Sequence, residues 1–321
     1  MQLTGCHHLT AVTADASRNH AFYTQKLGLR LVKKTVNQDD VSAYHLFYAD
    51  GLASPGTDLT FFDWPVGREQ RGTRSIVRTG LRVSDEVALS WWERRLGDLG
   101  VIRGKVERRY GRATLDFEDF EGQRLSLVVD PSGEAHPWEK SSVPAEQQIR
   151  GLGPIMLSVP ELGPTDAVLT RVMNLVRAGE YVLKEAGRAG VERTVFVYQM
   201  SGVGAQAELH VRVDRGMAPS GPGAGGVHHV ALRTPDVVQQ AAWALRLAQM
   251  GIGSSGPVDR FYFRSLYFRE PNGILFEIAT DGPGFGADEP MAALGETLAL
   301  PPLLEPRRAA IERGLKPLVT A

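Results

Sequence analysis

Two pairs of adjacent histidines are the residues of this sequence whose type and spacing most clearly allow metal chemistry. The stretch GCHHLTAV contains His7 and His8, and GVHHVALR contains His228 and His229. These four residues are half of the eight histidines in the chain. Imidazole is the commonest metal ligand among side chains. A repeated fold would place the two stretches side by side and build one site from both.

Composition limits the classes of function. The chain has 321 residues, of which 43% are hydrophobic and 23% charged, with a formal net charge of −1. These values predict a soluble globular protein and give no sign of a nucleic-acid partner. The sequence contains no apolar run of about 18 residues, so we expect no membrane span. It also shows no secretion signal, and we therefore expect a cytoplasmic protein. The single cysteine, Cys6, excludes an internal disulfide and a thiolate zinc cage.

One pattern, strand–helix–strand–strand–strand, recurs four times at a period of roughly 70–75 residues. In the first copy, Asp15 is a suitable N-cap for a helix in DASRNHAFYTQKLG, and Gly28 a suitable stop. The copies begin with strand-like stretches at 5–12, 76–83, 152–159 and 226–233.

A single unit of this kind leaves one face of its sheet open, so the units should pair around shared clefts. The Pro/Ser/Glu-rich stretch 131–149 is typical of a linker. We therefore expect one pair of modules in 1–130, a second pair in 150–285, and a C-terminal tail with a short helix in 286–321.

Paired βαβββ modules with a histidine on the first strand and a glutamate on the last resemble the vicinal oxygen chelate superfamily. This superfamily includes glyoxalase I, extradiol ring-cleaving dioxygenases and bleomycin resistance proteins. HHLTAVT, LTFFDWP and DRFYFRSLYFREPNGILFEIATDGPGF are similar to its hydroquinone-type ring-cleaving branch. The resemblance covers about residues 1–285 and implies an α+β fold, with four modules paired into two barrel-like sheets.

Alternation along a strand allows either histidine of each pair to face inward. The resemblance implies that the second one binds the metal, which gives His8 and His229, and it adds Glu277 as the third ligand. Glu277 lies in the apolar strand ILFEIAT, where a carboxylate without a partner is costly to bury.

Glyoxalase-type sites use a fourth protein ligand, which the first module does not supply in an obvious way. The positions that match Glu277 there are Thr60 or Phe62, and only a slip in register would bring Asp58 or Asp63 into play. Two imidazoles and one carboxylate suit non-haem Fe(II), although Mn(II) and Zn(II) bind similar donors.

Ligands from the first and fourth modules require those two modules to share a cleft, which leaves the second and third modules to share the other. The second module offers only Gly80 and Ser126 at the ligand positions. In the third module, the pattern of Glu208 and His210 favours a solvated edge strand. We therefore expect one metal per chain.

The resemblance also implies residues that act around the metal. Arg260 and Tyr267 match positions that line the pocket of the dioxygenase branch, where they would stabilise charge and exchange protons with substrate. His7, His228 and Thr10 match positions close to the metal ligands in the same branch. Strict alternation, however, points His7 and His228 away from the metal.

Two further expectations concern neighbours of the site. Cys6 lies two residues before His8, so regular strand alternation would place both side chains on one face. There the thiol could act as a fourth ligand or as a redox-sensitive group, but a small buried hydrophobic residue is the favoured interpretation. Aromatic side chains that could line a pocket are Phe22, Phe47, Phe62, Phe261 and Tyr262.

The sequence therefore predicts an Fe(II)-dependent dioxygenase that cleaves hydroquinone-type (or catechol-type) diols with O2. Two alternatives stay open. A glyoxalase-like isomerase or thiol transferase would use its metal as a Lewis acid and needs a fourth ligand. A metal-free binding protein of the bleomycin-resistance type would lack the ligands. Exposed sheet edges also allow a homo-oligomer.

Overall fold

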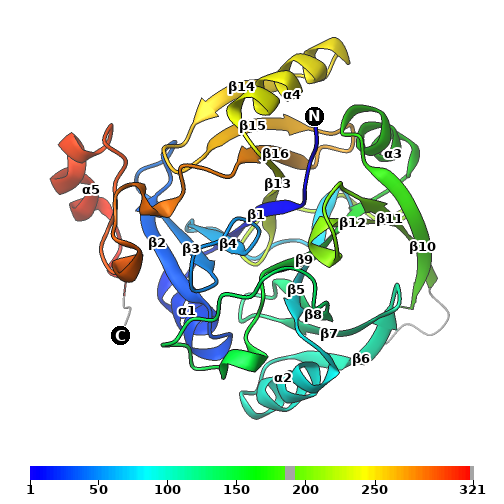
Figure 1. The fold of residues 1–321 in the computed structure, drawn as a ribbon, viewed down its shortest axis with the longest axis horizontal. Coiled ribbons are helices and arrows are strands. Elements are labelled where there is room, and N and C mark those ends of the chain that lie inside the picture. Colours follow the sequence, from blue (N-terminus) through cyan, green and yellow to red (C-terminus); the bar gives the residue numbers. More distant parts are fainter. Residues whose placement is uncertain (185–191, 319–321) are drawn as a thin grey trace.

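Two curled eight-stranded sheets form the body of the protein, and the longer helices lie outside them (Figure 1). The structure is a computed structural model that describes residues 1–184 and 192–318. Within these residues, each sheet takes two βαβββ modules. The predicted α+β class and the pairing of four modules into two barrel-like sheets are confirmed.

The first sheet joins the first and fourth modules. Its strands, in spatial order, are β14 (Ser254–Asp259), β15 (Arg264–Arg269), β16 (Leu275–Thr280), β13 (Val227–Thr234), β1 (Cys6–Thr13), β4 (Asp58–Asp63), β3 (Tyr44–Ala49) and β2 (Arg30–Val36). The two opening strands, β1 and β13, are antiparallel neighbours, and each pairs in parallel with the last strand of its own module. The strands that carry the histidine pairs therefore lie side by side, as predicted.

The second sheet joins the second and third modules in the same way. Its strands, in spatial order, are β10 (Val176–Lys184), β11 (Glu192–Gln199), β12 (Glu208–Val213), β9 (Leu152–Val159), β5 (Ser75–Val83), β8 (Arg124–Val129), β7 (Arg112–Glu118) and β6 (Arg103–Arg109). Each sheet thus combines one module from either side of the stretch 131–149. The division of the chain into domains at that stretch stays a prediction.

Acidic caps start the helix of three of the four modules. The carboxylates of Asp15, Asp85 and Asp236 each accept a hydrogen bond from the backbone N–H three residues later. Gly28 ends the first helix with a positive φ of 73°, as expected of a glycine stop. The module helices are α1 (Ala16–His20, continued by a π-helical turn over Ala21–Lys26), α2 (Glu86–Asp98), α3 (Gly163–Ala167, continued by a π-helical turn over Val168–Val172) and α4 (Val237–Gln249).

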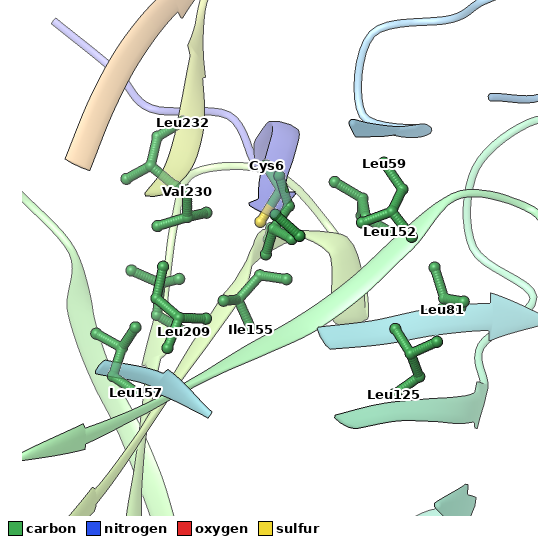
Figure 2. Packing of buried hydrophobic residues seen from close by; sticks show 14 of the residues in the cluster. Cys6, Leu59, Leu81, Leu125, Leu152, Ile155, Leu157, Leu209, Val230 and Leu232 are labelled. Atoms are coloured by element: carbon green, nitrogen blue, oxygen red, sulfur yellow. The ribbon is translucent and has the colours of Figure 1, made fainter. Parts of the chain in front are cut away.

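A shared hydrophobic core joins the two sheets. Figure 2 shows Cys6 in this cluster, with Val230 and Leu232 of its own sheet and Ile155 of the other. Burying such side chains removes apolar surface from water and holds the sheets together. The core therefore occupies one face of β1 and leaves the opposite face for polar residues.

The tail of the chain covers the β2 edge of the first sheet. Lys34 of β2 forms an isolated bridge with Leu298, and α5 (Arg308–Gly314) follows. A small apolar cluster fixes the tail and consists of Val36, Leu300, Leu304 and Ile311. None of the described helices is long and apolar enough to cross a membrane.

Candidate metal centre

The three predicted ligands meet on the polar face of the first sheet. His8 lies on β1, His229 on β13 and Glu277 on β16, which are adjacent strands. Glu277 Oε2 is 3.2 Å from His8 Nε2 and 3.0 Å from His229 Nε2. One ligand atom from each residue can be chosen so that all lie within 4.8 Å of one another, and all three residues are buried.

Ala231 keeps the space between these side chains open. It is the Cα partner of both His8 and Glu277, so the three residues form one row across the sheet. Cross-strand neighbours in such a row face the same side. A methyl group therefore stands where a larger side chain would separate the imidazole from the carboxylate.

The donor set fits a divalent transition metal. Both carboxylate oxygens of Glu277 and the Nε2 atom of His229 are buried without a hydrogen bond of normal geometry. Burial alone would raise the pKa of Glu277, but His8 and His229 beside it lower that pKa well below its usual value. An ionised carboxylate in this position needs a cation, and imidazole nitrogens with a carboxylate are suitable ligands for Fe, Mn or Zn.

His7 and His228 each contact the adjacent ligand histidine, because the strands depart from the strict alternation that was expected. The β1–β13 register slips by one residue at two places, between Cys6 and His8 and opposite Thr10 and Ala11. His7 is the extra residue of the first β-bulge and His228 that of the second. The bulges bring His7 Nδ1 within 2.9 Å of His8 Nδ1, and His228 Nδ1 within 2.8 Å of His229 Nδ1.

These contacts determine where the ligand protons lie. A histidine that binds a metal through Nε2 carries its proton on Nδ1 and donates it to a neighbour. Burial of the His7 ring lowers its pKa to about 3, and partial desolvation of the more exposed His228 ring lowers its pKa to about 4; the adjacent ligand histidine contributes in both cases. Both residues are therefore neutral near pH 7, and each offers a lone pair on Nδ1 as the acceptor.

A chain of hydrogen bonds occupies the position of a fourth ligand. Thr60 on β4 is the Cα partner of Thr10, just as Glu277 is the partner of Ala231. The Thr60 hydroxyl donates to Thr10 Oγ1 over 2.9 Å and lies 2.9 Å from His45 Nε2. Neither Asp58 nor Asp63 belongs to the potential metal-binding group.

His45 is a site residue that was not predicted from the sequence. It lies on β3 and lines the cavity, with its ring 4.0 Å from Phe47 and 4.4 Å from Phe62. Burial lowers its pKa well below the usual value. The sequence does contain a pattern that could have indicated this position, because His45 and Phe47 lie two residues apart on one strand and so share a face.

The cavity that reaches His8 and His229 has about 470 Å³ of space, part of it open to solvent. Arg260 lies at its mouth, where Asp39 accepts two hydrogen bonds from the guanidinium over 3.0 and 2.7 Å. Arg260 Nε also lies 3.4 Å from the Tyr267 hydroxyl. Burial and the charge of Glu277 raise the pKa of Tyr267, so its phenol carries a proton.

The remaining aromatic expectations are met in part. Phe47, Phe62 and Tyr262 line the cavity, and Phe263 packs against the His7 and His8 rings at 5.2 and 5.0 Å. Phe22 instead belongs to the hydrophobic core.

Cys6 also lies in the core, so the expectation that it shares a face with His8 is wrong. The bulge at His7 reverses the parity. Burial raises the pKa of the Cys6 thiol to about 12, as expected for a small buried hydrophobe.

The second sheet differs from expectation at Glu208 and His210. The pattern favoured a solvated edge strand, but β12 pairs with both β9 and β11, and both side chains are buried. Arg112 donates to both oxygens of Glu208, over 2.9 and 2.8 Å, which compensates for the burial of the carboxylate.

Comparisons with known proteins agree with this geometry. Residues 151–278 match the model of the glyoxalase/bleomycin resistance protein/dioxygenase superfamily. MhqA of Bacillus subtilis, provisionally described as a ring-cleaving dioxygenase, is 44% identical over 99% of this chain and 100% of its own length. A chlorohydroquinone/hydroquinone 1,2-dioxygenase of Sphingobium indicum is 32% identical over 95% of this chain and 93% of its own. The crystal structure of a provisionally assigned dioxygenase from Bacillus subtilis superimposes with a TM-score of 0.90, at 36% identity, over 100% of this chain and 99% of that one.

Proposed function

The chain belongs to the glyoxalase/bleomycin resistance protein/dioxygenase superfamily, and we propose that it is a ring-cleaving dioxygenase for hydroquinone-type diols. His8, His229 and Glu277 would hold an Fe(II) ion. When bound, this ion would supply the redox chemistry that lets O2 react with an aromatic diol. Mn(II) and Zn(II) suit the same donors.

One observation carries the proposal, namely that the site offers three strong ligands and a threonine where a fourth would be. The position equivalent to Glu277 is Thr60, whose hydroxyl is already bonded to Thr10. A site with three protein ligands keeps positions for small molecules such as a diol and O2. The glyoxalase-like alternative needs a fourth protein ligand, and the binding-protein alternative needs no ligands at all.

The surrounding residues supply orientation and protons. Phe47 and Phe62 give the cavity apolar walls suited to an aromatic ring. The protonated Tyr267 can donate a hydrogen bond to a substrate oxygen, and the Arg260 guanidinium can stabilise a phenolate. His45 holds Thr60 and faces the same space, so it helps to position whatever the cavity binds.

The cleavage consumes one O2 for each diol, breaks one ring C–C bond beside a hydroxylated carbon, and puts both oxygen atoms into the product. The test is oxygen uptake by anaerobically purified protein that has been loaded with Fe(II) and given methylhydroquinone. We expect uptake equimolar with the diol, and its loss in His8→Ala and Glu277→Ala.

His136→Ala is the matched control, because His136 lies outside the cavity and pairs with Asp50. It should bind iron and consume oxygen like the unaltered protein. If iron binds but neither methylhydroquinone nor catechol supports oxygen uptake, the proposed reaction is wrong. If His8→Ala still binds iron as tightly as the unaltered protein, the ligand assignment is wrong.

A further inference from the structure

The second sheet contains a cavity of its own, separate from the metal centre. It has about 380 Å³ of space, partly open to solvent, which is similar to the metal-centre cavity. The expectation that Gly80 occupies a ligand position is wrong, because by strand register Gly80 and Ser126 correspond to Thr10 and Thr60. Arg78 stands where His8 does, and His210 stands where Glu277 does. An arginine therefore replaces a metal ligand in this cavity.

Arginines dominate the polar lining of this second cavity. Arg78, Arg109 and Arg112 all line it. Glu208 neutralises Arg112 through the two-bond contact already described. Asp116 accepts two bonds from Arg109, both over 2.7 Å, and lies 3.2 Å from Arg78.

Glu107 also pairs with Arg109 over 3.1 Å, so each of the three guanidinium groups has a carboxylate neighbour. Arg78 has the longest of these contacts, 3.2 Å, and its partner Asp116 also binds Arg109. Among the residues that the structure describes, Asp116 is the one carboxylate in contact with Arg78, and the Arg78 guanidinium donates one hydrogen bond, to the backbone carbonyl of Leu125 over 3.0 Å. Burial lowers the pKa of Arg78 to about 10 even though Asp116 lies beside it. The guanidinium therefore has further N–H donors to offer, and the shared Asp116 carboxylate does not fully offset its burial.

Two neighbouring polar side chains, Tyr181 and His210, add no charge to the cavity. Tyr181 and His210 are joined by a 3.1 Å contact to His210 Nδ1, and His210 Nε2 lies 3.0 Å from Glu208. His210 then donates through Nε2 and accepts the Tyr181 hydroxyl at Nδ1. Burial lowers the pKa of His210, so this pair is neutral near pH 7. Val128, Pro154 and Met156 supply the apolar lining of the cavity.

We propose that this cavity binds a small organic carboxylate, with its charged group on Arg78 and its apolar body against Val128 and Met156. A guanidinium fork matches the planar carboxylate and supplies parallel N–H donors. Ring-opened acids of the kind that the proposed reaction would release belong to this class. The site nevertheless stands on its own residues and does not depend on that function.

The test is isothermal titration calorimetry of the full-length, metal-loaded protein at fixed ionic strength. The probes are crotonate, its neutral analogue crotonamide, and inorganic phosphate. We expect one crotonate per chain, no binding of crotonamide, and weaker binding of phosphate. Arg78→Leu should weaken crotonate binding about tenfold or more, because it removes a charged hydrogen-bond partner.

Arg108→Gln is the matched control, since Arg108 lies on β6 near Arg109 but pairs with Glu86 at the surface. It should bind crotonate normally. If Arg78→Leu does not fold, Arg78→Lys keeps the charge without the fork and should bind more weakly than the unaltered protein.

Several results would overturn the proposal. These are no crotonate binding at millimolar concentration, equal binding of crotonamide, tighter binding of phosphate, or unchanged binding in both Arg78 variants. Metal removal separates the two cavities, because a carboxylate held by the metal would be lost with a chelator, whereas one held by Arg78 would remain. Loss of crotonate binding on chelation therefore also refutes the site.

Discussion

Replacing His7 and His228 one at a time with phenylalanine tests whether these residues act through the metal ligands. Each accepts a hydrogen bond from the Nδ1–H of the adjacent ligand, over 2.9 and 2.8 Å respectively. Phenylalanine keeps a ring of similar size but cannot accept that hydrogen bond. We therefore expect weaker metal binding in both variants, with unequal losses.

The difference follows from burial. His7 is 3% exposed, so His7→Phe leaves the Nδ1–H of His8 buried without a partner, at a cost of about 1–3 kcal/mol or about 5- to 150-fold in metal affinity. His228 is exposed and lines a separate open cavity beside Trp64, where water can replace the lost acceptor. We expect a loss of about fivefold or less for His228→Phe.

The assay is competition between the protein and a chromophoric chelator for Zn(II), a redox-inert probe, at a fixed pH. It reports affinity and does not depend on turnover. His136→Phe serves as the control and should leave the affinity unchanged. Equal losses in the two variants would refute the argument from burial, and no loss in either would show that the paired histidines do not hold the ligand protons.

Three further predictions concern single side chains. Cys6, with its pKa raised to about 12 by burial, should react with a thiol reagent at pH 8 only after unfolding; rapid reaction of the native protein would contradict this. Ala231→Leu should abolish metal binding in equilibrium dialysis while the circular dichroism spectrum keeps its native form, because the added atoms fall between His8 and Glu277; retained binding would show that the row has more room. Asp39→Asn should raise the KM for the diol several-fold and change unfolding free energy by less than about 1 kcal/mol, since it releases Arg260 from an exposed pair; an unchanged KM would mean that Asp39 does not position Arg260.

The strands that carry the candidate ligands could be predicted because their patterns are local to each strand, whereas the choice of His8, His229 and Glu277 came from the resemblance to the superfamily. A histidine pair on two equivalent first strands and a glutamate in an apolar last strand are visible in the sequence. The need to bring them to one metal also predicted which modules share a sheet. Repetition within the chain therefore carried much of the information about topology.

The bulges could not be predicted in the same way, because they exist only in the register between β1 and β13. Alternation assumes regular pairing between the strands. One extra residue on a strand turns the side chains that precede it to the opposite face of the sheet. This is why the expected position of Cys6 was wrong and why His7 and His228 contact the ligand histidines. The burial of Glu208 and His210 was missed for a related reason, since it depends on the neighbours of β12 and on Arg112 from a different module.

The pairing of the first module with the fourth has a consequence for how the protein is made. Strand β1 leaves the ribosome early, but its antiparallel partner β13 and the glutamate on β16 follow more than 200 residues later. Contacts so distant in sequence form slowly, because a long loop must close first. The second and third modules, which are adjacent in the chain, can complete their sheet while β1 still waits for its partner. The metal can therefore bind only at the last stage of folding, after β1 and β13 have paired.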